Sequence, residues 1–232
     1  MTSEDYINKL MELDFYREGI HPEFIPFVGS EYSKHRILQI GESHYIPNYP
    51  EGSTDNNGNP REITNEITLT DFDGWWNGSY SDKLREITGW FNTSDVVKWY
   101  LEGYRDHAHG IFTNTLKSFC KIVTPNEAFE SISTVNSQKY NYFAFMYFYQ
   151  QPSIYYGENF TNALYIAGEY LGRTTEEIEA LWYDIFDRSV AIVESVIDVL
   201  EPKAIVITST EVQRYYKAYG SVDQSGTNYS KM

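Results

Sequence analysis

Residues 36–45 are Arg-Ile-Leu-Gln-Ile-Gly-Glu-Ser-His-Tyr, and this stretch decides the expected fold. A short apolar run ends at Gly41, and polar or aromatic side chains follow it. This pattern is typical of a buried strand in an α/β sheet, and open α/β sheets bind ligands at the carboxyl ends of their strands. Gly41 permits a turn with positive φ or the close approach of a ligand to the backbone. The stretch therefore predicts a strand over 36–41 with a site at its end.

Two further apolar runs predict strands over 141–148 and 204–209, each followed by polar residues. Helices are expected at 3–17 and 175–200, one or two helices at 94–122, and a further helix that begins at Thr210, Glu211 and Val212. Their predicted caps are Ser3, Ser94 and a capping box of Thr174 with Glu177. Strands that alternate with helices favour a parallel sheet. The expected fold is therefore a three-layer α/β/α sandwich with a mostly parallel central sheet.

The chain of 232 residues suits one α/β domain over 1–232. Asn, Gly, Asp, Ser and Pro cluster in residues 47–81, which predicts a long loop beginning just after Tyr45. A loop of this length is often functional, so we expect it to cover the site as a lid. Within it, Trp75 and Trp76 are expected to pack and anchor the loop rather than form an exposed surface.

The net charge is −15, from 33 acidic and 18 basic residues. This balance disfavours nucleic acid as a partner, because neutralising phosphates needs Lys and Arg. The single cysteine, Cys120, gives no internal disulfide and is expected to be a buried thiol. The sequence shows neither a signal peptide nor an apolar run of membrane-spanning length, so we expect a cytoplasmic protein with no membrane partner.

The candidate site is expected where the three strands end. The candidate catalytic residues are Glu42, Ser43 and His44, because a carboxylate, a hydroxyl and an imidazole follow one strand. Neighbours on an extended chain point to opposite sides, so these three do not form a ready triad. The candidate substrate-binding residues follow the three strands: Gly41, Tyr45, Gln150, Ser153, Ser209 and Thr210.

The sequence contains no dinucleotide-binding, P-loop, nucleophile-elbow or zincin motif. No cofactor and no metal are therefore expected, and a small molecule is the expected ligand. A metal site formed by Glu42 and His44 with Asp106, His107 and His109 is a minor alternative.

The order of features resembles the uracil-DNA glycosylase superfamily. There, the first strand ends in a Gly-(Gln/Glu)-x-Pro-(Tyr/Gly) turn, and Gly41, Glu42 and Tyr45 stand in matching places. Residues 143–151 resemble the middle strand of that superfamily. The predicted helix that ends before Pro202, Pro202 itself and the strand 204–209 resemble its Leu-x-Pro-x-x-Ile-Val element. The resemblance implies a hydrolase acting on a nucleobase-containing ligand, in which Tyr45 stacks on the base and Glu42 or His44 positions water.

Two alternatives remain open. Gly41-Glu42-Ser43 also resembles the Gly-Asp-Ser turn of the SGNH hydrolases, which implies an esterase with Ser43 as its nucleophile. The other alternative is a catalytically inactive binding domain of the same fold. In that case, Trp75, Trp76 and the Tyr-rich stretch 140–156 should form an exposed aromatic patch.

Overall fold

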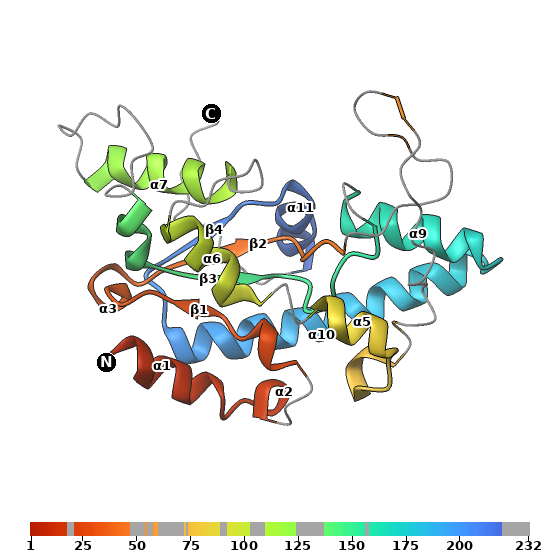
Figure 1. The fold of residues 1–232 in the computed structure, drawn as a ribbon, viewed down its shortest axis with the longest axis horizontal. Coiled ribbons are helices and arrows are strands. Elements are labelled where there is room, and N and C mark those ends of the chain that lie inside the picture. The colour runs from red at the N-terminus through yellow and green to blue at the C-terminus, as the bar shows by residue number, and fades with distance from the viewer. Residues whose placement is uncertain are drawn as a thin grey trace.

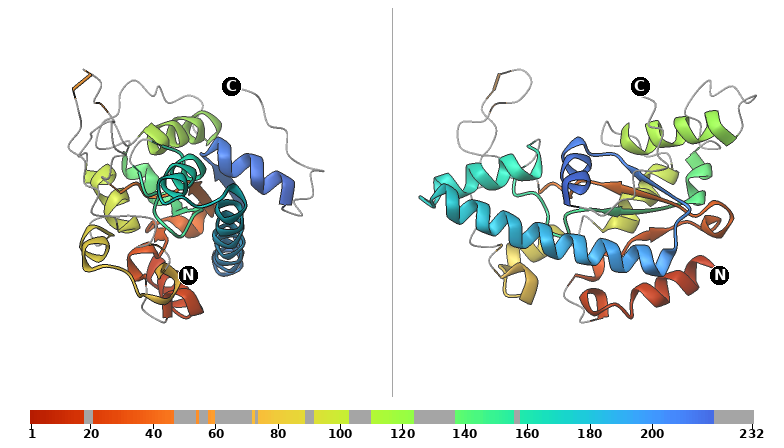
Figure 2. Two further views of the ribbon diagram at one scale, coloured as in Figure 1. Left: turned by 90° about the vertical axis from the view of Figure 1, so that its right-hand side faces the viewer. Right: turned by 180° about the vertical axis from the view of Figure 1, so that it is seen from behind.

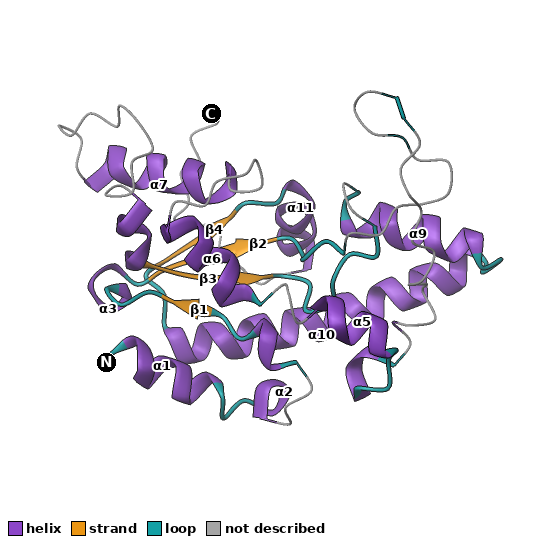
Figure 3. Ribbon diagram, viewed as in Figure 1, coloured by secondary structure: helices purple, strands orange, loops and turns teal. Residues whose placement is uncertain are grey.

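A four-stranded mixed sheet lies at the centre of the computed structural model (Figures 1 and 3). The structure describes residues 1–17, 21–46, 54, 58–59, 72, 74–88, 92–102, 110–123, 137–155 and 158–219. The strands are β1 (Phe27–Val28), β2 (Ile37–Gly41), β3 (Phe143–Tyr147) and β4 (Ala204–Ile207), in the spatial order β1-β3-β2-β4. Strand β2 is parallel to both β3 and β4, whereas β1 pairs antiparallel with β3.

The three strands predicted from the apolar runs are therefore present, and β2 lies between the other two. The antiparallel edge strand β1 was not predicted. It has only two residues, and its pairing with β3 is a long-range contact that leaves no local pattern in the sequence. The sheet is consequently mixed.

Hydrophobic clusters lie on both faces of the sheet. Helices α1 (Ser3–Leu10), α9 (Phe160–Tyr170) and α10 (Thr175–Leu200) pack on the face that carries Ala144 and Met146. Helices α6 (Thr93–Glu102) and α7 (Gly110–Val123) share a cluster with Phe143 and Phe145. Because successive strand residues point to opposite faces, the two clusters are on opposite sides of β3. Views from the front and from behind likewise place α6 and α10 on different sides of the sheet (Figures 1 and 2).

The start of α10 confirms the predicted capping box. The Thr174 hydroxyl accepts from Glu177 N–H at 3.3 Å, and the Glu177 carboxylate accepts from Thr174 N–H at 2.8 Å. The helix ends at Leu200, with Glu201 in the left-handed conformation (φ 45°) and Pro202 behind it. Its buried stripe follows the predicted helical spacing and includes Ile178, Trp182, Ile185, Val193, Val196 and Leu200.

The predicted helix over 3–17 is divided into α1 and α2 (Asp14–Arg17), and its predicted cap is wrong. Thr2, not Ser3, caps α1, because Thr2 has an acidic residue three positions on and forms a capping box with Asp5. Three residues on from Ser3 is Tyr6, which cannot complete such a box.

The segment 94–122 contains two helices, α6 and α7, as one form of the prediction allowed. The predicted cap at Ser94 is wrong, since α6 begins at Thr93 and Asn92 precedes it. The Asn92 side-chain oxygen accepts from Ser94 N–H at 2.8 Å. Asparagine suits this place because its short side chain reaches the free N–H groups of the first turn.

The remaining elements connect these layers. Helix α11 (Thr210–Tyr219) follows β4 where a helix start was expected, whereas α9 was not predicted. The short elements are α3 (Tyr32–His35), α5 (Asp82–Thr88) and the 3₁₀ helices η1 (Pro22–Phe24), η2 (Trp75–Asn77) and η4 (Gln138–Tyr142). None of the described helices combines the length and apolarity that crossing a membrane requires.

Several predictions fall outside the described residues. Most of the expected lid over 47–81 does so, as do Asp106, His107, His109 and the side chain of Cys120.

Candidate functional site

The Glu42 carboxylate marks the end of β2 and is held by two other elements. Its Oε1 accepts from Phe160 N–H at 2.9 Å, and its Oε2 accepts from the Ser209 hydroxyl at 2.7 Å. The main-chain oxygen of Glu42 also accepts from Tyr149 N–H at 2.9 Å. The residue as a whole is half-buried.

Two helices begin beside this carboxylate. Asn159 caps α9, since its side-chain oxygen accepts from Asn162 N–H at 2.8 Å. Ser209 caps α11, since its hydroxyl accepts from Val212 N–H at 3.2 Å. Helix N-termini carry partial positive charge and free N–H groups, so they stabilise an anion placed between them. The end of β2 therefore lies against the starts of α9 and α11 (Figure 1).

A second carboxylate, Glu211, adjoins the first. Its Oε1 accepts from the Tyr149 hydroxyl at 3.2 Å and from the Thr161 hydroxyl, which in turn accepts from Trp182 Nε1–H at 3.1 Å. Burial is the largest cause that raises the pKa of Glu211 above its usual value. The negative charge of Glu42 raises this pKa further, while the hydrogen bonds from Thr161 and Tyr149 lower it.

Glu211 was not predicted as a site residue from the sequence, where it was assigned only to the start of a helix. An acidic side chain in the first turn normally needs no other explanation than the helix dipole. The available signal was its position two residues after Ser209, at the end of the third apolar run.

Aromatic packing holds this cluster in place. The Tyr149 ring stacks on the Phe160 ring with centroids 3.9 Å apart and planes 13° apart. Tyr149 therefore contacts both carboxylate residues, through its N–H to Glu42 and its hydroxyl to Glu211. Burial raises the pKa of the Tyr149 hydroxyl, so this group stays a proton donor at neutral pH.

His44 occupies a different environment. Its ring is 2% exposed, contacts Phe24 edge-on and lies 4.0 Å, centroid to centroid, from Tyr147. Its Nε2 is 3.4 Å from the Thr93 hydroxyl at the start of α6. Burial lowers the pKa of His44 to about 3, which keeps the ring neutral at physiological pH. These neighbours differ from those of the Glu42 carboxylate, which come from α9 and α11.

The residues around His44 continue the strand pairing beyond β2. Tyr45 forms an isolated parallel bridge with Ser153, and Ser153 N–H donates to His44 O at 2.6 Å. Ser43 is 1% exposed, and its hydroxyl has no hydrogen-bond partner among the described residues. Tyr45 is half-buried.

Gln150 is part of the packing between the sheet and its neighbours. Its side-chain oxygen accepts from the Tyr16 hydroxyl at 3.3 Å, and its main-chain oxygen accepts from Trp75 Nε1–H at 2.8 Å. Trp75 is fully buried and stacks on His21, with centroids 3.7 Å apart. The expected packing of Trp75 is therefore confirmed. Trp75 is not part of an exposed aromatic patch of the kind that the binding-domain alternative requires.

Gly41 has neither a positive φ nor open space above it. It is the last residue of β2, paired with Tyr147, and the glycines with positive φ in the described part are others. A Cβ added at Gly41 would lie 3.2 Å from the rings of Phe145 and Tyr147. Of the two features that a glycine permits here, the positive φ is absent, and it is side chains that approach this glycine closely.

The structure thus brings together Glu42 and Ser209, with Thr210 next in the chain and Glu211 beside them. It places His44, Gln150 and Ser153 in other packing environments. Within the described residues, no group of three or more His, Cys, Asp or Glu side chains is arranged to hold a metal ion.

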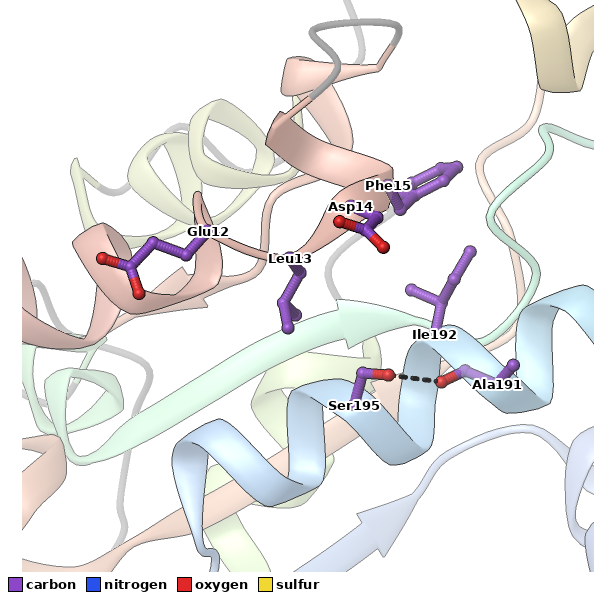
Figure 4. A pocket seen from close by; sticks show the side chains of 7 residues that line it. All are labelled: Glu12, Leu13, Asp14, Phe15, Ala191, Ile192 and Ser195. Carbon is purple, nitrogen blue, oxygen red and sulfur yellow. Dashed lines mark hydrogen bonds between the residues drawn. The ribbon is translucent and has the colours of Figure 1, made fainter.

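A groove of about 390 Å³ lies elsewhere, between the α1–α2 connection and α10 (Figure 4). Leu13 and Ile192 point into the space between these segments. The other lining residues are Glu12, Asp14, Phe15, Ala191 and Ser195. None of these residues belongs to the cluster around Glu42. The chain matches no protein-family model, and no curated protein and no solved structure is significantly similar to it.

Proposed function

We propose that this protein is a hydrolase, related in design to the uracil-DNA glycosylases, that cleaves the bond between a nucleobase and its sugar. The observation that carries the proposal is the hydrogen bonding of Glu42, at the end of β2, to the starts of both α9 and α11. Ligands of open α/β sheets bind at this end of the strands. The proposed architecture is a three-layer α/β/α sandwich with a mostly parallel sheet.

The two carboxyl groups suit acid–base chemistry because their environments differ. Glu211 has a raised pKa and so holds its proton to higher pH than an ordinary carboxyl group. Glu42 lies half-buried and accepts two hydrogen bonds, from the Phe160 N–H and the Ser209 hydroxyl, at the starts of two helices. A pair of titratable groups in unlike environments is a common basis for dividing acid and base roles.

In the proposed reaction, the C1′–N bond breaks with its electron pair on the base nitrogen, and water supplies the new C1′–O bond. Glu211 gives its proton to the base nitrogen, and Glu42 takes the proton that water releases. Proton exchange with solvent then restores both groups, so the reaction needs no redox partner. Tyr45, a half-buried residue three positions after Glu42, would stack on the base.

The proposal assigns the water-positioning role to Glu42 rather than His44. The His44 ring is enclosed by Phe24, Tyr147 and Thr93 and is only 2% exposed. A general base must come within hydrogen-bond reach of the proton that it abstracts. The half-buried Glu42 meets this requirement more readily than the enclosed imidazole does.

The release of free nucleobase, measured by chromatography, tests the proposal. The substrates are the common nucleosides, uridine among them, and uracil-containing single-stranded DNA. Glu42→Gln should lower the rate of base release by about 10²–10⁴-fold, because the substitution removes the general base but keeps the size and shape of the side chain. Glu194→Gln, at an exposed position of α10, makes the same charge change and should leave the rate unaltered.

Equal rates in the wild type and Glu42→Gln would contradict the proposal. Covalent labelling of Ser43 by a fluorophosphonate probe, lost in Ser43→Ala, would instead support the SGNH-like esterase and replace the glycosylase-like reaction.

A further inference from the structure

We propose that two copies of this chain associate through the free edge of β4, which joins their two four-stranded sheets into one sheet of eight strands. The two β4 strands run antiparallel about a twofold axis at Val206. The proposal goes beyond the function proposed above and does not depend on it. It follows from the exposure of β4, from the direction of its main-chain groups and from its sequence.

Strand β4 lies at one edge of the sheet and is less covered than such strands normally are. Among the described residues, it pairs with β2 alone (Figure 1). Strands that pair in parallel are normally buried on both faces of their sheet. Ala204 and Ile205 point to opposite faces, yet both are exposed, Ile205 by 38%. The start of β4 is therefore open to solvent on both faces in the described part of the chain.

The hydrogen bonds of β4 show which of its main-chain groups remain at the free edge. Ala204 and Thr208 donate their N–H groups towards β2, to main-chain oxygens at 3.4 and 2.9 Å. Alternate residues of a strand direct their N–H and C=O groups to the same neighbour, so Ile205 and Ile207 direct theirs away from β2. These outward groups have no hydrogen-bond partner among the described residues. The free edge therefore offers two donors and two acceptors to a further strand.

The sequence of β4 does not protect this edge. Natural edge strands commonly carry a Lys, a Pro or a bulge, which discourages a second strand from pairing. Strand β4 is Ala-Ile-Val-Ile and pairs with β2 in an unbroken register. Pro202 and Lys203 precede the strand and do not interrupt it. A continuous run of apolar, mostly β-branched residues favours the addition of a strand.

A second copy of β4 fits this edge because the strand is complementary to itself. In an antiparallel pair centred on Val206, Ile205 of one copy lies opposite Ile207 of the other. These two residues carry the outward main-chain groups, so N–H···O=C bonds form at both positions. Side chains that lie opposite each other share a face, which places isoleucine beside isoleucine. Lys203 comes opposite Ser209, so the lysines of the two copies stay apart.

Sedimentation equilibrium of the full chain at high micromolar concentration tests the proposal. We expect twice the mass of one chain, and tighter association as salt is added, because salt screens the repulsion between two chains of net charge −15. Ile205→Lys should weaken the association about tenfold or more, because it places a charge opposite Ile207. Leu171→Lys is the matched control, since Leu171 at the end of α9 is also 38% exposed, and should associate as the wild type does.

Disulfide formation tests the register of the pair, in a chain that carries Cys120→Ser. Val206→Cys should link two copies under mild oxidation, because a residue on the axis faces its own equivalent with Cα atoms about 4.5 Å apart. Ala204→Cys should remain unlinked, because this position faces Thr208 of the other copy.

A wild-type chain that remains a monomer would overturn the proposal. A dimer that a folded Ile205→Lys variant, checked by circular dichroism, leaves intact would also overturn it. Linking through Ala204→Cys as readily as through Val206→Cys would contradict the pairing about Val206, whatever the stability of the Ile205 variant.

Discussion

The Ser209 hydroxyl donates to Glu42 Oε2 at 2.7 Å while it accepts from Val212 N–H at 3.2 Å. One side chain therefore caps α11 and fixes the carboxylate that follows β2. This relationship explains why the third apolar run ends in a hydroxyl, since a polar residue serves both the helix start and the half-buried carboxylate of Glu42. The stability of α11 and the geometry of the site are consequently linked.

Ser209→Ala should lower the free energy of unfolding by about 1–3 kcal/mol, because it removes a helix cap and one partner of a half-buried carboxylate. Urea denaturation followed by circular dichroism measures this loss. Thr210→Ala, at the exposed next position, is the control and should stay within about 0.5 kcal/mol of the wild type. Equal effects of the two substitutions would show that the Ser209 contacts add no stability.

Gly168→Ala should destabilise the packing of α9 on α10. A Cβ at this position would lie 2.5 Å from both Cγ1 and Cδ1 of Ile178, which is itself 1% exposed. In an open helix the same change stabilises by about 1 kcal/mol, whereas overpacking costs about 1–3 kcal/mol. Urea denaturation gives the change in the free energy of unfolding. A loss of stability indicates overpacking against Ile178, and a gain indicates an open helix position.

Ile178→Ala provides the matching test, since it removes both the Cγ1 and the Cδ1 atoms that the new methyl group would meet. The double variant should be more stable than the sum of the two single effects predicts, by about 0.5 kcal/mol or more. Additive effects would mean that Gly168 and Ile178 do not contact each other as described.

Trp75→Phe should cost about 1–3 kcal/mol beyond the loss of ring volume, because it leaves the buried Gln150 oxygen without its 2.8 Å donor. Trp76→Phe is the neighbouring control at a half-buried position, where Arg188 lies 5.4 Å above the ring, and should cost less than half as much. Thermal unfolding followed by circular dichroism gives both values. A larger loss in the Trp76 variant would contradict the anchoring role of Trp75.

His44 should make the protein less stable as the pH falls from about 6.5 towards 3. Its pKa is lowered from 6.5 to about 3 in the folded state, so between these values the unfolded chain binds the extra proton. Stability therefore rises with pH in this window, by up to about 1.4 kcal/mol per pH unit. His44→Gln should flatten the dependence measured by urea denaturation between pH 7 and 4, and an unchanged slope would show that the imidazole titrates normally.

The sequence predicted those features that short-range patterns specify. Thr174 and Glu177 are three residues apart, so their capping box could be identified without knowing the fold. The end of β2 could be placed because a buried strand and its polar exit are adjacent in the chain. The cap of α1 was wrong because Thr2 and Ser3 are both good caps, and only the position of Asp5 decides between them.

Long-range pairing accounts for most of what the sequence did not predict. The two residues of β1 become a strand only when they meet β3, and Phe160 starts a helix beside Glu42, which lies 118 positions earlier. Glu211 likewise became a candidate only when α11 was seen to place it near Glu42. Polar residues at a strand end indicated where to expect a site, but not which of them would meet.

Backbone amide NMR, with a nucleoside titrated into the full chain, shows whether a nucleoside binds beside Glu42. We expect the shift changes to cluster at Gly41–Tyr45, Tyr149, Phe160–Thr161 and Ser209–Glu211, and we expect Glu42→Gln to weaken the binding. Shift changes confined to the groove between the α1–α2 connection and α10, at Glu12–Phe15 and Ala191–Ser195, would contradict this expectation.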